Sequence, residues 1–221
     1  EEREIIGIST DSKHVMKGDL FVCFSGGEHD GHEFAAEAVS AGASALAVER
    51  ELPLPVPQIV VKDGRKAAGE IARAFYGHPE RKLKIIGITG TNGKTTTAHM
   101  LAAILAAAGK ECGIIGTLGI RYANREISPD LTTPDPPYLY KIFADMAEAG
   151  VEYVVMEVSA HALHFGKVDG ILFEAGIFTN FTEDHLDFFK TMDAYAAAKE
   201  KLFEKGRCKR AVFNFDDAEG R

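Results

Sequence analysis

The feature that most constrains this chain is a strand, a glycine-rich loop and a helix joined in direct succession. The apolar run KIIGIT, residues 84–89, has the length and composition of a buried strand. It leads through GITGTNGKTT, residues 87–96, into a helical pattern over residues 95–108 that Gly109 ends. The apolar residues Met100, Leu101, Ile104, Leu105 and Ala108 fall on one face of this expected helix. Such a junction points backbone N–H groups and a helix N-terminus at one place, which favours phosphate binding. We therefore expect an α/β fold with a mostly parallel sheet of the phosphate-loop type.

The residue types of this loop are those of a nucleoside-triphosphate-binding loop, but their spacing differs from the standard pattern. Lys94 is placed to neutralise the outer phosphates, and the hydroxyl of Thr95 to ligate Mg²⁺. The standard pattern has a glycine six residues before the lysine, where this chain has Ile88. The GxxGxxG spacing also disfavours a dinucleotide-binding fingerprint, which needs GxGxxG. The alternative is a glycine-rich turn with an incidental lysine.

Composition excludes several other classes of protein. The chain has 221 residues and a net charge of −8, which argues against general nucleic-acid binding. It has no signal peptide or apolar run of membrane-spanning length, so we expect no membrane partner. Its three distant cysteines are typical of reduced thiols in a cytoplasmic protein. Because the chain begins with Glu1 rather than Met, we expect a fragment of a longer protein.

Two styles of sequence meet near residue 83. Before it, short strand-like runs alternate with helical stretches over residues 33–41 and 65–75, which predicts a small α/β domain over residues 1–83. The polar segment 77–82 contains a glycine and a proline and has the composition of a linker. From residue 84, strands and helices alternate to residue 221, which predicts a second, incomplete domain with right-handed crossovers.

Polar side chains follow several strands of the second domain. Ligands of doubly wound sheets bind outside the carboxyl ends of the strands, where Glu157 and His185 are expected. These two residues are candidates to meet Mg²⁺ near the γ-phosphate. Glu157 is equally well explained as a helix cap or ion-pair residue, and His185 as an ion-paired surface histidine. His161 and His164 have a spacing found in zinc sites, but no third ligand accompanies them.

These motifs resemble the Mur ligases of cell-wall peptide synthesis. GTNGKTT, LTTPD, EVSAHAL, TNFTEDHLD and the AAAK helix stand in that family's order and spacing. The run STDSKHVMKGDLFVCFSGGEHDGHEF is similar to the uridine-nucleotide-binding domain of the members that add the third amino acid. The resemblance covers essentially the whole chain. It also implies that a C-terminal domain, which completes the ATP site and selects the amino acid, is absent.

The resemblance assigns roles residue by residue. It implies an enzyme in which Lys94, Lys199 and His185 are catalytic, and in which Mg²⁺ meets Thr95, Glu157, His185 and a carbamylated Lys199. Composition alone would make Lys199 a solvated helix lysine. The phosphates of ATP would be bound by Gly90, Thr91, Asn92, Gly93, Lys94, Thr95 and Thr96. The uridine-linked substrate would be bound by Thr10, Ser12, Gly27, Glu28, His29, Thr132, Thr133, Ser159 and Lys167.

The implied reaction is ATP-dependent amide formation. A carboxylate of UDP-N-acetylmuramoyl-L-alanyl-D-glutamate would form an acyl phosphate, which the amine of diaminopimelate or lysine would attack. The family implies a monomer whose partners are these three small molecules, with no nucleic acid or membrane. Two alternatives remain: a ligase that adds glutamates to folate, and a nucleotide-binding module without turnover. The fragment alone is expected to bind rather than to turn over.

Four positions depart from the family's usual pattern. Ala160 stands where a second serine is common, and Phe165 where a polar residue is frequent. Lys167 and Lys13 each replace an arginine, so a bidentate contact to an anion becomes a point-charge contact.

Overall fold

The computed structural model describes residues 4–26, 29–128 and 130–221. They form two compact units, one of residues 4–75 with 136–138 and the other of residues 76–135 with 139–221. The sequence placed the boundary after residue 83. It falls earlier because Pro79–Arg81 forms a short 3₁₀ helix, η3, whose Pro79 and Glu80 are buried against strand β5 of the second unit. The linker-like composition of this segment therefore belongs to a packed element.

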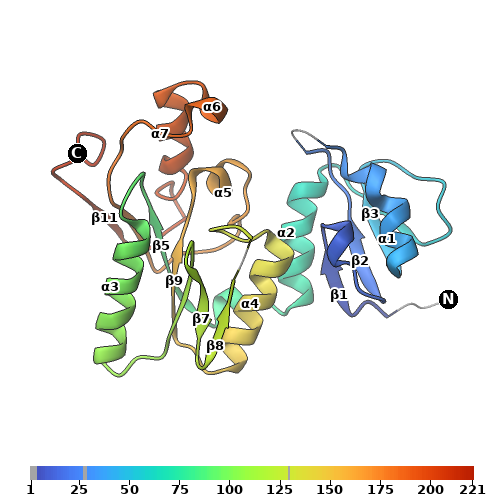
Figure 1. The fold of residues 1–221 in the computed structure, drawn as a ribbon, viewed down its shortest axis with the longest axis horizontal. Coiled ribbons are helices and arrows are strands. Elements are labelled where there is room, and N and C mark those ends of the chain that lie inside the picture. The colour runs from blue at the N-terminus through green and yellow to red at the C-terminus, as the bar shows by residue number, and fades with distance from the viewer. Residues whose placement is uncertain (1–3, 27–28, 129) are drawn as a thin grey trace. The chain divides into compact units, whose positions relative to one another are not determined.

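The first unit is a four-stranded parallel sheet in the order β1-β2-β3-β4. Its elements are β1 (Gly7–Ser9), η1 (Ser12–His14), β2 (Asp19–Val22), η2 (Gly31–Phe34), α1 (Ala35–Ala41), β3 (Ala45–Val48), β4 (Gln58–Val60) and α2 (Gly64–Phe75) (Figure 1). Strands β2 and β3 are fully buried and pack with α1 around Phe21, Cys23 and Leu46. Burial raises the pKa of the Cys23 thiol to about 12, so this cysteine is a core residue.

The second unit contains a seven-stranded sheet in the order β11-β10-β5-β9-β6-β7-β8. Its strands are β5 (Lys84–Thr89), β6 (Cys112–Gly116), β7 (Gly119–Tyr122), β8 (Arg125–Ile127), β9 (Tyr153–Glu157), β10 (Ala175–Phe178) and β11 (Ala211–Phe213). All pairings are parallel except those of β7 and β8, which continue from β6 as an antiparallel edge. The expected α/β class with mostly parallel sheets is thus confirmed, and the antiparallel edge is an addition to it.

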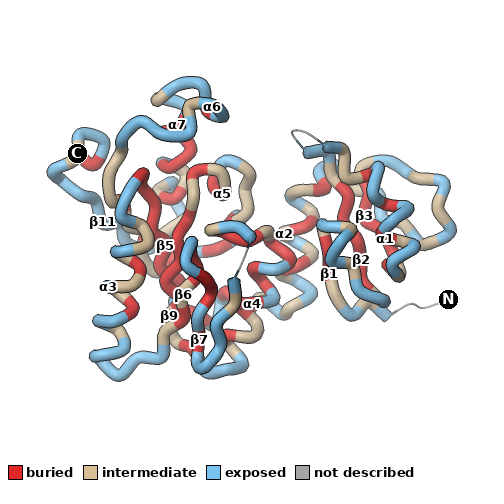
Figure 2. The backbone as a smooth tube through the Cα atoms, viewed as in Figure 1, coloured by how far each residue is buried: buried red, intermediate tan, exposed pale blue. Residues whose placement is uncertain are grey.

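Helices cover the two faces of this sheet. They are α3 (Lys94–Ala107) and α4 (Pro136–Glu148), whereas α5 (Ala160–His164) and α6 (Leu186–Phe189) pack against α7 (Met192–Glu200). Helix α3 packs on Ile88 and Val155, whereas Met146 of α4 lies against Gly113 on the opposite face. Figure 2 shows the central strands as the most continuously buried part of the chain.

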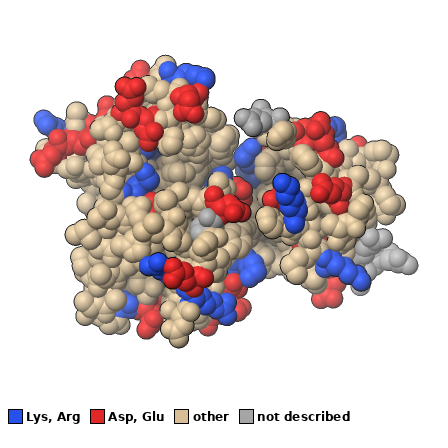
Figure 3. Space-filling model, in the orientation of Figure 1, with Lys and Arg blue, Asp and Glu red and all other residues tan. Residues whose placement is uncertain are grey.

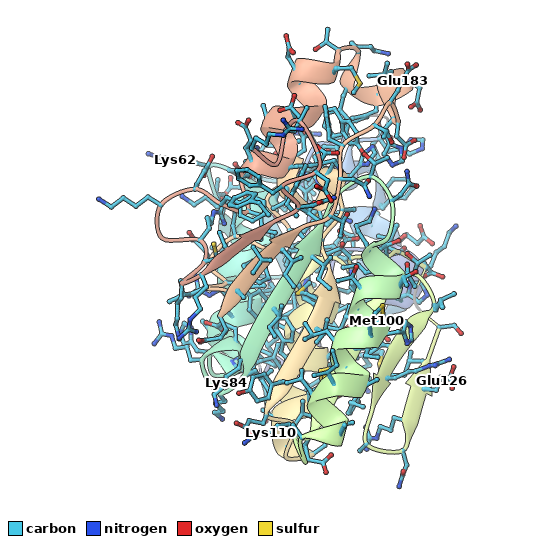
Figure 4. The ribbon with its side chains drawn as sticks, turned by 90° about the vertical axis from the view of Figure 1, so that its left-hand side faces the viewer. Lys62, Lys84, Met100, Lys110, Glu126 and Glu183 are labelled. Carbon is cyan, nitrogen blue, oxygen red and sulfur yellow. The ribbon has the colours of Figure 1, made fainter. Side chains whose placement is uncertain are left out.

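One expectation about α3 is wrong. The pattern of large apolar residues predicts a buried face that includes Met100 and Ile104, but these side chains are 62% and 64% exposed. The residues that pack are Ala98 and Ala102, with Leu101 and Leu105 beside them. Small alanines allow the helix to approach the sheet closely, and Met100 lies on the outer side of α3 (Figure 4). None of the described helices is long and apolar enough to cross a membrane.

Candidate functional site

The candidate site lies at the carboxyl ends of β10, β5, β9 and β6, which are neighbours in the sheet. Register places Ile88 opposite Glu157 and Thr89 opposite Phe178. The loop after β5 and the residues that follow β9, β10 and β6 therefore meet at one edge. In Figure 4 the ends marked by Lys84 and Lys110 are the opposite, amino ends of these strands.

The phosphate loop is held in place by the segment that follows β10. The backbone N–H of Thr91 donates to the carbonyl of Asn180 at 2.9 Å, and that of Asn92 to Asn180 Oδ1 at 2.9 Å. In return, the hydroxyl of Thr179 donates to the Asn92 carbonyl at 2.7 Å. Gly90 has a φ of 138°, and a Cβ there would lie 2.0 Å from Thr179 Oγ1. Only glycine fits this position, because both the backbone conformation and the contact exclude a side chain.

Lys94 is the first residue of α3 and folds back over the loop. Its Nζ donates to the carbonyls of Gly90 and Thr91, each at 2.8 Å. Burial lowers the pKa of Lys94, and the charges of Glu157 and Asp184 oppose that shift. A cation is thus held directly above a loop that opens a helix, where an anionic phosphate is favoured.

Glu157 is a carboxylate with only 1% of its surface exposed. Its Oε2 accepts from the hydroxyl of Thr95 at 3.0 Å and from that of Thr117 at 3.1 Å, and its Oε1 accepts from the Thr117 N–H at 3.0 Å. Glu157 is therefore neither a helix cap nor one half of an ion pair in the described chain. A carboxylate and a hydroxyl 3.0 Å apart beside a phosphate loop form a set of hard oxygen donors that fits Mg²⁺.

The loop that carries Thr132 and Thr133 reaches the same place. Thr132 Oγ1 lies 3.1 Å from Thr117 Oγ1. Thr133 is 2% exposed, donates to the Glu157 carbonyl at 3.0 Å and accepts from the Ser159 N–H at 3.2 Å. Ser159 in turn caps α5 through the Ala162 N–H. Thr133 and Ser159 thus use their hydroxyls within the protein, whereas Thr132 is less enclosed.

Lys167 forms an ion pair with Asp135, at 2.8 Å between Nζ and Oδ1. The lysine side chain is 12% exposed and that of Asp135 is 44% exposed, so only the lysine side of the contact is buried. It connects the loop after α5 to the residue that precedes α4. The position where the family commonly has arginine therefore holds a lysine whose charge is already compensated.

Lys199 lies on α7 and is 2% exposed, although composition predicts a solvated lysine. Its Nζ stands 4.1 Å from the centre of the Tyr195 ring. Burial lowers the pKa of Lys199 to about 7, the charge of Lys94 adds to this shift, and Asp184 opposes it. A substantial fraction of this side chain is therefore a neutral amine near pH 7.

His185 lies among aromatic side chains. Its Nε2 is 3.5 Å from Asp184 Oδ2, and its ring centre is 4.9 Å from that of His161 and 5.9 Å from that of Tyr195. His161 and His164 pack on Phe188 and Phe189. Among the described residues, no three His, Cys, Asp or Glu side chains converge to hold a metal ion. The role of His185 towards Mg²⁺ stays a prediction.

In the first unit, the residues assigned to the uridine lie around η1 and before η2. The hydroxyl of Ser12 donates to Glu37 at 3.1 Å, and Thr10 is half-buried between β1 and η1. The His29 ring meets the Phe34 ring edge-on. Gly27 and Glu28 lie outside the described residues. The role of these residues stays a prediction.

Sequence reasoning missed two residues of the site, Thr117 and Tyr195. Thr117 follows β6 directly, so the rule that ligands bind at strand ends would have found it had β6 been recognised to Gly116. Tyr195 lies four residues before Lys199 on α7, a spacing at which helical side chains meet, so helical periodicity would have found it.

Both parts of the chain match protein families. Residues 4–76 match the Mur ligase family catalytic domain, and residues 88–221 match the Mur ligase middle domain. The UDP-N-acetylmuramoyl-L-alanyl-D-glutamate–2,6-diaminopimelate ligase of Geobacillus thermodenitrificans is 46% identical over 221 residues, which are 97% of this chain and 45% of that protein. The enzyme of the same name from Aquifex aeolicus is 44% identical over 99% of this chain and 45% of its own length. The chain thus spans about 45% of the curated relatives it matches.

Comparison with solved structures also finds ligases of this kind. A structure of a UDP-N-acetylmuramoyl-L-alanyl-D-glutamate–2,6-diaminopimelate ligase superposes with a TM-score of 0.82 at 30% identity, covering 98% of this chain and 44% of that one. A structure of the UDP-N-acetylmuramoylalanyl-D-glutamyl-2,6-diaminopimelate–D-alanyl-D-alanyl ligase from Acinetobacter baumannii has a TM-score of 0.66 at 26% identity, covering 97% of this chain and 44% of that one. Since the middle-domain match alone spans more than half of the residues, the chain belongs to the Mur ligase family.

Proposed function

We propose that this chain is the nucleotide-binding and acceptor-binding part of an ATP-dependent ligase. The enzyme would join an amino acid to UDP-N-acetylmuramoyl-L-alanyl-D-glutamate in cell-wall synthesis. The observation that carries the proposal is the phosphate loop with Lys94 above it and the buried Glu157–Thr95 pair beside it. The names of the relatives at 44–46% identity supply the acceptor and favour diaminopimelate as the added amino acid.

The chemistry requires two anions to meet. In the first step, a carboxylate oxygen of the D-glutamate residue attacks the γ-phosphorus of ATP, and the bond to the departing ADP oxygen breaks. In the second, the amine of the amino acid attacks the acyl carbon and loses a proton, and inorganic phosphate leaves. The N-terminus of α3 and Lys94 would offset the negative charge as carboxylate and phosphate approach.

Thr95 and Glu157 are the residues we expect to hold Mg²⁺, with the described oxygen donors in support. When bound, the ion would neutralise phosphate charge and orient the γ-phosphate. Thr132, which lies next to Thr117 at the same edge, is the best-placed residue of its loop to contact the acceptor. Thr133 and Ser159 would shape that loop rather than meet the substrate through their hydroxyls.

We also propose that Lys199 reacts with CO₂. The lone pair of the neutral amine would form a bond to the carbon of CO₂, and loss of one proton would leave a carbamate. The burial of Lys199 and its lowered pKa favour the neutral form that this reaction needs. The carbamate would place a negative charge close enough to Lys94 for the two charges to attract each other. His185 would lie near this group through its contact with Tyr195.

The charge and cysteine content are consistent with a cytoplasmic monomer that acts on small molecules. Acidic and basic side chains are interspersed on the face shown in Figure 3, without a broad basic surface. The three cysteines are free thiols, as a reducing compartment requires.

Binding and turnover test the proposal separately. The 221-residue chain is titrated with UDP-N-acetylmuramoyl-dipeptide and with Mg²⁺–ATP in a calorimeter, and we expect saturable binding of each. An enzyme of full family length containing this sequence is then assayed for phosphate release with diaminopimelate and with lysine. Release that requires the dipeptide acceptor supports the assignment. Release stimulated equally by a folate acceptor would overturn it.

A further inference from the structure

We propose that Thr117 is a positioning residue that orients the Glu157 carboxylate and connects it to the acceptor loop at Thr132. This inference rests on the proposed function, because it assumes that Glu157 serves a metal–nucleotide complex. It adds a residue that neither the phosphate-loop pattern nor the strand-end clusters indicated.

The position of Thr117 follows from the topology of the sheet. Strand β6 is the parallel neighbour of β9, with Ile115 opposite Met156. One residue later on β9 is Glu157, and just beyond β6 is Thr117. The backbone at Gly116 approaches the Glu157 carboxylate closely, because a Cβ on Gly116 would lie 2.2 Å from Glu157 Oε1. A side chain at position 116 would therefore displace the Glu157 carboxylate from the place where the turn between β6 and β7 meets it.

Thr117 binds both oxygens of the carboxylate. Its N–H donates to Oε1 at 3.0 Å and its hydroxyl to Oε2 at 3.1 Å. Two bonds from one residue fix the plane of the carboxylate, whereas Thr95 contacts Oε2 alone. Hydrogen bonds to a charged acceptor are stronger than those between neutral groups, and Glu157 is almost fully buried. The carboxylate is thus preorganised before any ligand binds.

The direction of the hydrogen bonds among Thr132, Thr117 and Glu157 follows from the number of hydroxyl protons. The hydroxyl of Thr117 carries a single proton, and it donates that proton to Glu157 Oε2. The 3.1 Å contact between Thr117 and Thr132 then requires Thr132 to donate. The hydroxyls are ordered from Thr132 to Thr117 to Glu157. A ligand that forms a hydrogen bond with Thr132 changes the hydrogen bond between Thr132 and Thr117. Because Thr117 also binds Glu157, the acceptor loop is linked to the carboxylate.

The test uses Mn²⁺ in place of Mg²⁺ and a non-hydrolysable ATP analogue. The free Mn²⁺ signal in electron paramagnetic resonance reports the affinity of the 221-residue chain, without turnover. Thr117→Val keeps the backbone N–H and the side-chain shape but removes the hydroxyl. We expect its affinity for the Mn²⁺–nucleotide complex to fall about tenfold, the scale on which residues that orient metal ligands act. Thr117→Ser keeps the hydroxyl and is expected within about twofold of wild type.

The matched control is Thr97→Val on α3, which makes the same exchange outside the site and should leave the affinity unchanged. The link to the acceptor loop is measured by repeating the titration with UDP-N-acetylmuramoyl-dipeptide. We expect the acceptor to change the Mn²⁺–nucleotide affinity of wild type and of Thr117→Ser, but not of Thr117→Val. Thr132→Val removes the link from its other end, and it provides the test if Thr117→Val fails to melt cooperatively.

The outcomes separate the two proposals. If the wild-type chain binds the complex and Thr117→Val binds it equally well, the positioning role is overturned while the proposed function stands. If Thr117→Ser is as impaired as Thr117→Val, the hydroxyl is not the active feature and the role is also overturned. If the wild-type chain binds neither the complex nor the acceptor, the proposed function fails and this inference fails with it.

Discussion

The phosphate loop with Lys94 and helix α7 with Lys199 place two lysines in one site by different means. Lys94 is held by the carbonyls of Gly90 and Thr91, four and three residues earlier in the chain. Its place is therefore set by local sequence. Lys199 has the ring of Tyr195 beside it, and both are buried on α7, which packs against α5 and α6.

This difference separates the chemistry of the two lysines. The pKa of Lys94 is lowered by burial, but opposing charges and two carbonyls favour its ammonium form. The pKa of Lys199 falls to about 7, because burial and the charge of Lys94 act in the same direction. One lysine is suited to remain a cation, and the other to supply a neutral amine.

The largest effect is expected for Lys94→Ala. Removing the cation leaves the helix N-terminus and the proposed Mg²⁺ to offset the charges of carboxylate and phosphate as they approach each other. We expect phosphate release by the family-length enzyme to fall by about 10³-fold or more, the scale on which groups that stabilise transition-state charge act. The assay measures inorganic phosphate in the presence of both substrates.

Lys110→Ala is the matched control. Lys110 pairs with Glu152 at the amino ends of the strands, where Figure 4 labels it, far from the loop along the sheet. It should release phosphate at the wild-type rate. Retained turnover in Lys94→Ala would remove the phosphate loop from the mechanism.

The second effect is expected for Lys199→Ala, with rescue. If Lys199 acts as a carbamate, alanine removes a carboxylate, and turnover should fall by about 10²-fold. Acetate or formate can enter the space left by the side chain, so part of the activity should return as their concentration rises. Lys201→Ala is the control, because its side chain lies near the His164 carbonyl at the surface. A mutant with wild-type rates would contradict the carbamate.

The two lysines also show how much of the molecule its sequence reveals. The boundaries of β5 and the start of α3 follow from apolar periodicity and glycine placement, and Lys94 is fixed within them. Tyr195 and Thr117 lie at positions that helical spacing and the strand-end rule indicate. The burial of Lys199, by contrast, depends on which elements pack together, and no local pattern contains that information. The error over Met100 has the same origin, because the small residues of α3 pack on the sheet while Met100 and Ile104 stay exposed. Local rules predict the loop, and tertiary packing decides which side chains are buried.

The pH dependence of carbamate formation is the third prediction. An ammonium cannot attack CO₂, so the reaction requires the neutral form of Lys199. Since its pKa lies at about 7, the neutral fraction rises about tenfold from pH 6 to pH 8. We expect the carbamate signal in ¹³C NMR with ¹³CO₂ to rise over the same range and to vanish in Lys199→Ala. An ordinary lysine, with a pKa of about 10.4, would give almost no signal at pH 8. A signal that persists in Lys199→Ala would assign it to another amine.

The smallest effect is expected where the loop is held by more than one bond. Thr179→Val removes the hydroxyl that donates to the Asn92 carbonyl, but Asn180 Nδ2 also donates to that carbonyl, at 3.1 Å. The acceptor stays satisfied, so we expect a loss of about 0.5–1 kcal/mol in unfolding free energy and about a threefold weaker affinity for ATP. Asn180→Ala removes the bonds to both the N–H and the carbonyl of Asn92, and should cost more in each measurement. Urea unfolding and ATP titration of the two variants decide the order. If Thr179→Val were the more damaging change, the loop would depend on one hydroxyl rather than on a shared set of bonds.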